Sequence, residues 1–159
     1  NGIGERAGNT ALEEVAVIVA LKGVGETGIQ LDQLNAISEH VARVTRVPVQ
    51  PNRAIVGRNA FTHSSGIHQD GILKCAENYQ FVAPEVVGRP GHDFVLTARS
   101  GRNAVVHVAR QRGHAVSDAS RDALYAAFVR FADTVPGAVD GDELDAIVRG
   151  VMAAEPVTA

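Results

Sequence analysis

Apolar residues three and four positions apart recur along most of this chain, and this spacing constrains its fold more than any other feature. It places side chains on one face of an α-helix, so each row predicts an amphipathic helix. Glycine or proline interrupts the pattern at Gly23, Pro48, Gly113 and Pro136. The chain is therefore expected to be mostly helical, with a short strand at Phe94–Thr97. The rows are Leu12, Val15, Ala16 and Val19; Leu34, Ile37, Val41 and Val44; Val105, Val108 and Ala109; Leu124, Ala127, Phe128 and Phe131; and Leu144, Ile147, Val148 and Val151.

Polar residues just ahead of these rows mark the expected helix starts. Thr10 and Glu13 have the spacing of a capping box, in which each side chain bonds the backbone of the other residue. Ser100, Ser117 and Asp142 are residue types that favour the N-cap position, because their side-chain oxygen accepts a bond from a free backbone N–H. Each of these residues is expected to fix the first turn of its helix.

The stretch Asn59–Lys74, with the sequence NAFTHSSGIHQDGILK, gathers chemically active side chains around two glycines, Gly66 and Gly71. Two interpretations fit it. It is either a polar loop running into a helix, with histidines that only satisfy hydrogen bonds, or a segment that presents a catalytic group. A helix is expected to continue over Gly71–Tyr79. The polar members of the stretch are His63, Ser64, Ser65, His68, Gln69 and Asp70.

His63 and His68 are poorly spaced for a shared metal ion. Paired histidine ligands on a helix favour a spacing of four, as in HExxH, whereas a spacing of five separates two side chains by about 140° around the helix. No cysteine or second acid stands nearby at ligand spacing. A lone histidine acting as general acid or base, oriented by Gln69, Asp70 or a hydroxyl group, fits the residues better. The flanking glycines favour His68 for this role, on a backbone that is expected to bend.

The chain opens on a glycine-rich turn, NGIGERAGN, over Asn1–Asn9. Its glycine spacing differs from the GxGxxG fingerprint of dinucleotide-binding folds. It fits either a flexible turn or a loop whose backbone approaches a ligand closely, with Arg6 placed for a phosphate or carboxylate. A helix that starts directly after the loop would turn its free N–H groups toward such an anion.

Composition argues against several classes of partner. Lys and Arg number 15 against 18 Asp and Glu, so the formal charge is 15 − 18 = −3, which offers no basic field for nucleic acid or a membrane surface. Cys75 is the only cysteine, so no intrachain disulfide is expected and a reducing cytoplasm fits best. No apolar run approaches the roughly 20 residues of a membrane span, and no basic-then-apolar leader opens the chain. Because the glycine-rich turn follows neither Met nor a strand, we expect a chain cut inside a larger domain.

Several motifs occur in an order that resembles the 2-isopropylmalate synthases, acetyl-CoA-dependent condensing enzymes related to homocitrate and citramalate synthases. The longest, NRAIVGRNAFTHSSGIHQDGILK (Asn52–Lys74), is similar to the linker region of these enzymes. The likeness covers nearly the whole chain, so it is more specific than a lone glycine pattern. The other motifs are NGIGERAGNTALEEV (Asn1–Val15), AENYQFVAPEVVG (Ala76–Gly88), LTARSGRNAV (Leu96–Val105) and ALYAAFVRFAD (Ala123–Asp133).

This resemblance implies an α/β fold class, built on a TIM (β/α)8 barrel of which the chain would supply only the last part. Residues 1–28 would be the final βα loop and helix of the catalytic barrel. Residues 29–92 would form a linker subdomain with the catalytic histidine and tyrosine, and residues 93–159 a small helical subdomain. The leucine-sensing domain of the family has no counterpart after Met152.

The resemblance also implies roles for the glycine-rich loop. Asn9 would supply the last ligand of a catalytic divalent metal, through its side-chain oxygen, and such ligation suits Mg²⁺ or Mn²⁺ while Zn²⁺ also accepts it. The metal would be shared with the missing part of the barrel. The residues implied in acetyl-CoA binding are Gly2, Gly4, Glu5, Arg6 and Gly8.

For the catalytic groups, the resemblance implies that His68 acts near the reacting carbonyls and enters the barrel of a partner subunit. Tyr79 would donate its hydroxyl to the same site, and Asp70 or Gln69 would orient His68. The implied reaction is a Claisen-type condensation of acetyl-CoA with 2-oxoisovalerate in leucine biosynthesis. The implied enzyme is a cytoplasmic homodimer with a shared active site, and the chain would be inactive without the missing barrel.

Two alternatives remain at this point. One keeps the enzyme class but changes the keto acid to 2-oxoglutarate or pyruvate, as in homocitrate and citramalate synthases. The other is a non-catalytic partner that uses its helices for dimerisation alone. The presence of His68, Tyr79 and Asn9 together favours an enzyme, because a scaffold needs none of them.

Overall fold

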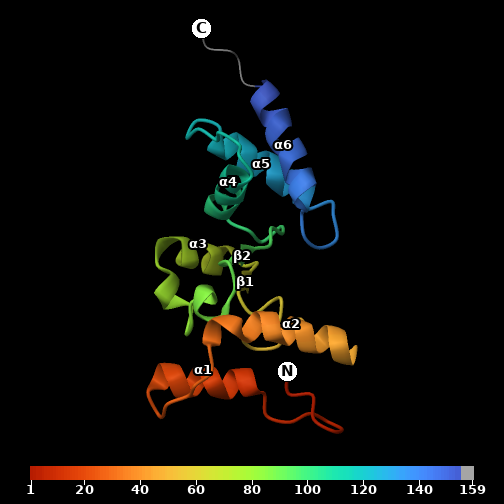
Figure 1. The fold of residues 1–159 in the computed structure, drawn as a ribbon. Coiled ribbons are helices and arrows are strands. Elements are labelled where there is room, and N and C mark those ends of the chain that lie inside the picture. Colours follow the sequence, from red (N-terminus) through yellow and green to blue (C-terminus); the bar gives the residue numbers. More distant parts are fainter. Residues whose placement is uncertain (155–159) are drawn as a thin grey trace. The chain divides into compact units, whose positions relative to one another are not determined.

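Helices dominate the fold, as the apolar spacing predicted. A computed structural model describes residues 1–154, and Figure 1 traces the elements. The short 3₁₀ helices are η1 (Leu31–Gln33), η2 (Ala76–Asn78) and η3 (Pro84–Val87), and the strands are β1 (Thr62–His63) and β2 (Asp93–Phe94). The α-helices are α1 (Leu12–Lys22), α2 (Leu34–Thr45), α3 (Gly66–Lys74), α4 (Arg102–Gln111), α5 (Arg121–Ala132) and α6 (Gly141–Ala154).

Two compact units make up the chain. The first contains Asn1–Thr62 and Gln80–Asp93, and the second contains His63–Tyr79 and the chain from Phe94 onward. Both units are therefore discontinuous in sequence. The expected division at residues 28 and 92 stays a prediction, as does the assignment of residues 1–28 to a barrel.

The two short strands form a parallel pair. The N–H of Asp93 donates to the carbonyl of Phe61, and the N–H of Val95 donates to the carbonyl of His63, both at 3.0 Å. Donors and acceptors thus advance together along both strands, which is the parallel pattern. The strand expected at Phe94–Thr97 is confirmed in part, since β2 begins one residue earlier and is shorter.

The first unit packs around a small apolar core that joins α1, α2 and η3. Asn35 is buried, and its Nδ2 donates to the carbonyl of Val87 at 2.7 Å, which ties α2 to η3. Gly88 ends η3 with a φ of 80°, and a Cβ there would lie 2.1 Å from the carbonyl oxygen of Asp32. Only glycine fits this position. The core residues are Val17, Leu34, Phe61, Val82 and Val87.

The buried faces of α1 and α2 differ from the predicted rows. Of those rows, Leu12 and Ile37 remain 62% and 56% exposed. The predicted faces are correct only in part, because Ala16 and Leu34 are buried as expected while tertiary partners set the rotation of each helix. The residues buried in α1 are Glu13, Ala16 and Val17. Those buried in α2 are Leu34, Asn35 and Ser38.

Two predicted N-caps are wrong. α1 starts after Ala11 without any side-chain cap, so Thr10 does not form the expected capping box. The buried Ser100 uses its hydroxyl oxygen to accept the N–H of Thr97 at 3.0 Å, and α4 starts after Gly101 instead. A local turn thus competes successfully with the helix for the serine side chain.

The cap of α6 lies two residues earlier than predicted. Asp140, and not Asp142, accepts the N–H of Glu143 at 2.9 Å, while the Glu143 carboxylate accepts the N–H of Asp140 at 2.8 Å. This reciprocal pair is a capping box. Ser117 bonds reciprocally with Ser120 in the turn before α5, so it initiates the turn without being the N-cap.

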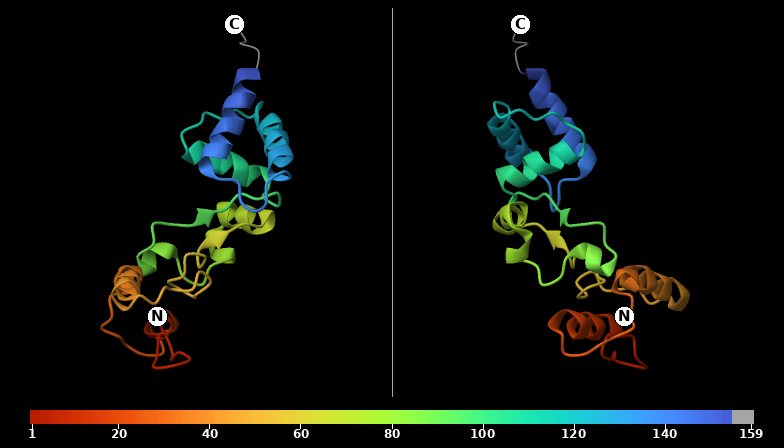
Figure 2. Two further views of the ribbon diagram at one scale, coloured as in Figure 1. Left: turned by 90° about the vertical axis from the view of Figure 1, so that its right-hand side faces the viewer. Right: turned by 60° about the vertical axis from the view of Figure 1, so that its left-hand side comes forward.

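The second unit has its core between α4, α5 and α6, which pack against one another in both views of Figure 2. Phe128, Leu124 and Leu144 are completely buried there. These three helices therefore share one apolar core. The other buried members are Leu96, Ala104, Val105, Val106, Ala109, Val116, Ala132, Val139 and Val148.

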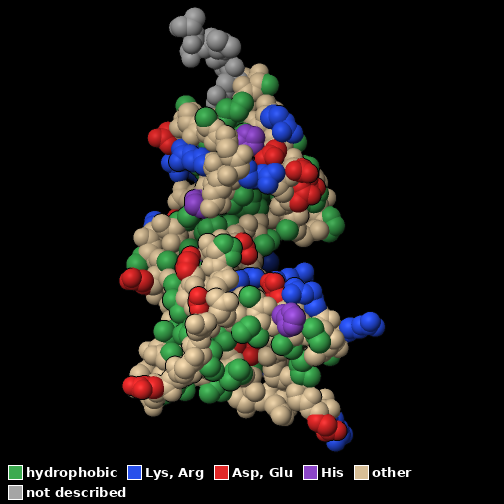
Figure 3. Space-filling view, in the orientation of Figure 1, with side chains coloured by type: hydrophobic (Ala, Val, Ile, Leu, Met, Phe, Trp, Pro, Cys, Tyr) green, Lys and Arg blue, Asp and Glu red, His purple; other side chains and the backbone are tan. Residues whose placement is uncertain are grey.

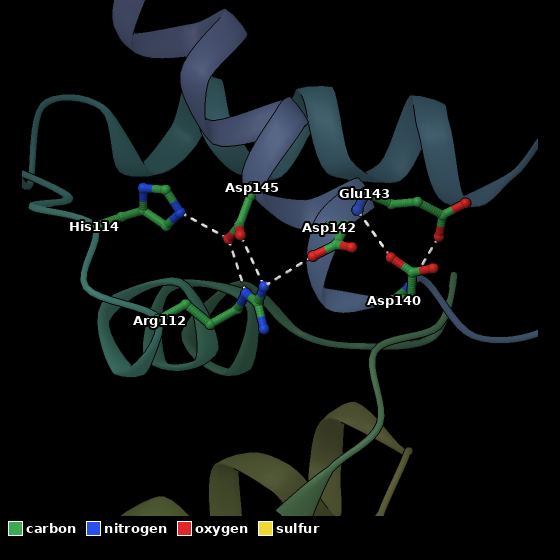
Figure 4. A network of polar contacts seen from close by, with 6 residues as sticks. All are labelled: Arg112, His114, Asp140, Asp142, Glu143 and Asp145. Atoms are coloured by element: carbon green, nitrogen blue, oxygen red, sulfur yellow. Dashed lines mark hydrogen bonds and ion pairs between the residues drawn. The ribbon is translucent and has the colours of Figure 1, made fainter.

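A charged network joins the end of α4 to α6 (Figure 4). The Arg112 guanidinium donates to both carboxylate oxygens of Asp145, at 2.8 and 2.7 Å, and His114 Nε2 lies 2.8 Å from the same carboxylate. These bonds, from Arg112 first and His114 second, hold the pKa of Asp145 below its ordinary range. His114 is therefore a half-buried residue bonded to α6. His107 is also half-buried, and burial lowers its pKa.

Candidate functional site

The glycine-rich loop folds back on itself in the first unit. The N–H of Asn9 donates to the carbonyl of Gly2 at 2.9 Å and closes the loop. Gly2 and Gly4 both have a φ of 62°, and a Cβ at Gly4 would lie only 2.8 Å from the backbone carbon of Gly8. Side chains at these positions would therefore open the loop, which explains the glycine pattern physically.

The loop forms one wall of a hollow of about 440 Å³. Four of the residues predicted for acetyl-CoA or metal binding line it together, namely Gly2, Arg6, Gly8 and Asn9. Gly4 and Glu5 are not among the lining residues. Residues 47–50 and Arg53, in the segment after α2, also line the hollow.

Sequence reasoning missed Arg53 as a member of this site. Its Nε lies 3.2 Å from Glu14 Oε1 and 3.9 Å from Glu13 Oε1, both in the first turn of α1. The guanidinium also lies against Gly2, where a Cβ would be 2.6 Å from Nη2. No local spacing links positions about 40 residues apart, so the only available signal was the position of Arg53 inside the long linker motif.

In the second unit, the buried Gln69 holds α3 against the strand region. Its Nε2 donates to the carbonyls of His63 and Val95, at 2.9 and 3.1 Å. At the start of the same helix, the N–H of Gly66 donates to the carbonyl of Arg99 at 3.1 Å. Gln69 therefore points into the protein and does not orient His68 directly.

His68 lies on the exposed side of α3, and its ring centroid is 5.2 Å from that of Tyr79, with the planes at 52°. Gly71 makes this contact possible, because a Cβ there would lie 2.0 Å from Tyr79 Cε2. The expected bend around His68 is wrong, since the helix runs regularly from Gly66 to Lys74. The helix expected over 71–79 also ends at Lys74 and is followed by η2. The structure thus presents His68 from within a helix.

Asp70 is engaged away from His68. Its carboxylate accepts a bond from Lys74 Nζ at 2.6 Å and one from Asn103 Nδ2 at 2.7 Å. These two bonds, Lys74 first, lower the pKa of Asp70 below its ordinary value. The bond to Asn103 connects α3 to α4, so Asp70 supports the helix that carries His68.

The described residues 1–154 contain no cluster of three or more His, Cys, Asp or Glu side chains that would hold a metal ion. His63 belongs to β1 and its ring centroid lies 6.1 Å from that of Phe94. The exposed Asn9 offers one side-chain oxygen, and a hard cation takes about six oxygen ligands. Asn9 therefore fits a metal site only if further ligands come from outside these residues.

The predicted site residues thus form two groups. The acetyl-CoA residues and Asn9 belong to the first unit, and His68, Asp70 and Tyr79 belong to the second. Within each unit, the structure brings together most of the members that the sequence suggested.

Comparisons with known proteins agree with the motifs. The family described as homocitrate synthase post-HMGL domain-like matches residues 55–136. A 2-isopropylmalate synthase of Shewanella loihica is 45% identical over 151 residues, which covers 93% of this chain and 29% of that protein. The enzymes of the same name from Shewanella woodyi and Shewanella baltica (strain OS155) are 46% and 48% identical over 136 residues, 84% of this chain and 26% of each relative.

These matches confirm the resemblance to 2-isopropylmalate synthases. The chain spans between 26% and 29% of the length of these curated relatives. None of the helices within residues 1–154 has the length and apolar character needed to cross a membrane.

Proposed function

The chain belongs to the homocitrate synthase post-HMGL domain-like family, and we propose that it is the C-terminal portion, or a small subunit, of a 2-isopropylmalate synthase. The proposed reaction is the Claisen-type condensation of acetyl-CoA with 2-oxoisovalerate. In this scheme the chain is inactive alone, because a barrel portion supplies the remaining catalytic groups. The enzyme is a cytoplasmic homodimer in which each active site draws residues from two subunits.

The observation that carries this proposal is the contact between His68 on α3 and Tyr79, which directly follows η2. An imidazole and a phenol lie with ring centroids 5.2 Å apart on the exposed side of a helix fixed from behind by Gln69. A surface that served only for dimerisation would have no need for a glycine that seats the tyrosine ring. The pair suits proton transfer, because imidazole donates and accepts protons near neutral pH and a phenol donates a hydrogen bond.

In the reaction, His68 would move a proton at the reacting carbonyls, with Tyr79 donating its hydroxyl to the same oxygen. Asp70 would act on the position of α3 through Lys74 and Asn103. The loop residues Gly2, Gly4, Glu5, Arg6 and Gly8 would hold acetyl-CoA, with the glycines allowing close approach of the backbone. Asn9 would contribute one oxygen ligand to Mg²⁺, Mn²⁺ or Zn²⁺, and the bound cation would polarise the carbonyl of the keto acid.

A row of exposed apolar side chains on α1 supports a larger catalytic domain around the loop. Leu12, Val15, Ile18 and Leu21 are all more than 40% exposed. At about 100° per residue, a spacing of three moves each side chain about 60° around the axis, so the four residues wind around roughly half of the helix surface. In Figure 3, hydrophobic side chains reach the surface over this part of the chain. A barrel portion packed against this row would bury it, at about 25 cal/mol per Å² of apolar surface.

A second candidate keeps the mechanism and changes the keto acid. The family that matches residues 55–136 is described after homocitrate synthase. For this reason 2-oxoglutarate is retained as an alternative substrate, together with pyruvate. The test is to assay the complete enzyme for release of CoA from acetyl-CoA with each of the three keto acids. We expect kcat/KM for 2-oxoisovalerate to exceed the other two by at least about tenfold, a difference of roughly 1.4 kcal/mol. A preference for 2-oxoglutarate or pyruvate would replace 2-oxoisovalerate as the proposed substrate. If none of the three keto acids is condensed, the alternative of a non-catalytic dimerisation partner would be favoured.

A further inference from the structure

The charged side chains that line the hollow beside the glycine-rich loop are all positive. Its lining residues include two arginines, Arg6 and Arg53, and no aspartate or glutamate. The chain as a whole carries a formal charge of −3, and the two carboxylates that pair with Arg53 lie outside this lining. A concave site with two cations and several backbone groups suits a phosphate or another compact anion.

Arg53 is paired with two carboxylates of α1 that do not line the hollow. The carboxylate of Glu14 lies 3.2 Å from Nε and that of the buried Glu13 lies 3.9 Å from it. Nε itself is buried, while 29% of the side chain is exposed. The carboxylates of α1 therefore pair electrostatically with the Nε end of the guanidinium, while Arg53 also lines the hollow.

The terminal nitrogens of Arg53 are available to a ligand. Within residues 1–154, the guanidinium approaches both carboxylates most closely through Nε, and neither Nη1 nor Nη2 donates a hydrogen bond to the protein. Nη2 lies against Gly2, close to the point where Asn9 closes the loop. An arginine offers two parallel N–H donors in a rigid plane, which matches phosphate oxygens better than a lysine does.

We propose that Arg53 is a substrate-binding residue that contacts the phosphate groups of acetyl-CoA, together with Arg6. This inference rests on the proposed function, since it takes acetyl-CoA as the ligand of the loop. Glu13 and Glu14 act as positioning residues that orient the guanidinium before the substrate arrives. Preorganisation of this kind lowers the entropy lost on binding.

The test compares acetyl-CoA with acetyl-pantetheine, a truncated thioester without phosphates, in the complete synthase that carries this chain. For Arg53→Ala we expect KM for acetyl-CoA to rise about ten- to a hundredfold, the loss typical of a charge-assisted hydrogen bond. KM for acetyl-pantetheine and for the keto acid should stay within about threefold, as should kcat. Arg53→Lys should recover part of the affinity, because it keeps the charge without the planar fork.

Arg43→Ala serves as the matched control, because Arg43 is an exposed arginine of α2 outside the lining of the hollow. This substitution should leave kcat and the KM values for acetyl-CoA, acetyl-pantetheine and the keto acid unchanged. An equal loss with both thioesters would overturn phosphate contact and leave Arg53 as a support of the loop. No loss with either thioester would overturn any role in this site.

A separate readout keeps this inference distinct from the proposed function. If the unmutated enzyme condenses none of the keto acids, the proposed function fails, and binding is then measured directly by calorimetry with CoA and with pantetheine. Weaker binding of CoA to Arg53→Ala, with binding of pantetheine unchanged, supports the phosphate contact on its own. Equal CoA affinity in both proteins contradicts it.

Discussion

At the scale of single residues, Gly71 decides which groups meet on α3. It leaves room for the Tyr79 ring beside His68, where a Cβ would lie 2.0 Å from the ring. The sequence led to His68 and Tyr79 through a family resemblance, and the resemblance does not reveal how the two rings are held. Gln69 and Asp70 are next to His68 in sequence but point elsewhere, because helical neighbours leave the axis about 100° apart. Sequence adjacency therefore predicted the wrong orienting groups.

The first prediction is that His68→Ala lowers kcat of the complete enzyme by at least about a hundredfold, as expected for loss of a positioned acid or base. The exposed imidazole contributes little packing, so thermal stability and metal affinity should stay near those of the unmutated protein. Steady-state kinetics with saturating substrates measures the effect.

His40→Ala is the control for this prediction, since His40 is exposed on α2. It should change the rate by less than about a factor of two. His114 is unsuitable as a control because its ring is bonded to Asp145. A His68→Ala enzyme within tenfold of normal activity would remove the imidazole from the proposed chemistry.

At the scale of helices and strands, the sequence predicted the existence of the helices better than their orientation. Five rows of apolar residues correspond to α1, α2, α4, α5 and α6. The buried face was correct for α5 and α6, where a neighbouring apolar helix covers each row. It was correct only in part for α1 and α2, because α1 also buries Glu13 and α2 also buries Asn35. Tertiary hydrogen bonds and distant partners set these rotations, and neither is encoded in local spacing.

The second prediction concerns the core of the second unit. Phe128 is completely buried between α4, α5 and α6, so Phe128→Ala should lower the free energy of unfolding by about 3–5 kcal/mol. Denaturant unfolding followed by circular dichroism measures this value. Phe81→Ala is the matched control, because Phe81 is 53% exposed. This substitution should lower the free energy of unfolding by less than about 1.5 kcal/mol. Equal losses in the two variants would mean that the helices do not pack as described.

The third prediction is a pH dependence at the junction of α4 and α6. The pKa of Asp145 is lowered in the folded protein by Arg112 and then by His114. Its contribution to stability is therefore complete above the unfolded pKa of about 3.9 and is lost as the pH falls through that value toward the folded one. Between pH 6 and pH 3, the denaturant midpoint of the unmutated chain should fall more steeply than that of Asp145→Asn.

Asp142→Asn is the matched control for this measurement. Asp142 also faces Arg112, at 3.4 Å, but its side chain is fully exposed and its charge is screened by water. Its pH profile should therefore follow that of the unmutated chain. Parallel profiles for Asp145→Asn and the unmutated chain would show that the ion pair makes no pH-dependent contribution.

At the scale of the whole molecule, the proposed active site needs residues from both compact units. Asn9 belongs to the first unit, whereas His68 and Tyr79 belong to the second. The resemblance implies that the two groups meet across a dimer, with each barrel receiving His68 from its partner. The sequence lacks the information to settle this arrangement, because a pattern of residues along one chain is the same whether a contact is made within a subunit or between two.

The last prediction tests that arrangement by mixing two inactive variants of the complete enzyme. His68→Ala lacks the proposed acid or base, and Asn9→Ala lacks a metal ligand, so each homodimer should be inactive. A heterodimer with shared sites pairs the intact Asn9 of one subunit with the intact His68 of the other, so one of its two sites is complete. Equal random mixing of the subunits of a twofold dimer should therefore restore about a quarter of normal activity. Heterodimers isolated through two different affinity tags should reach about half. If such heterodimers form and remain inactive, His68 acts within its own subunit, because every site then carries one of the two defects.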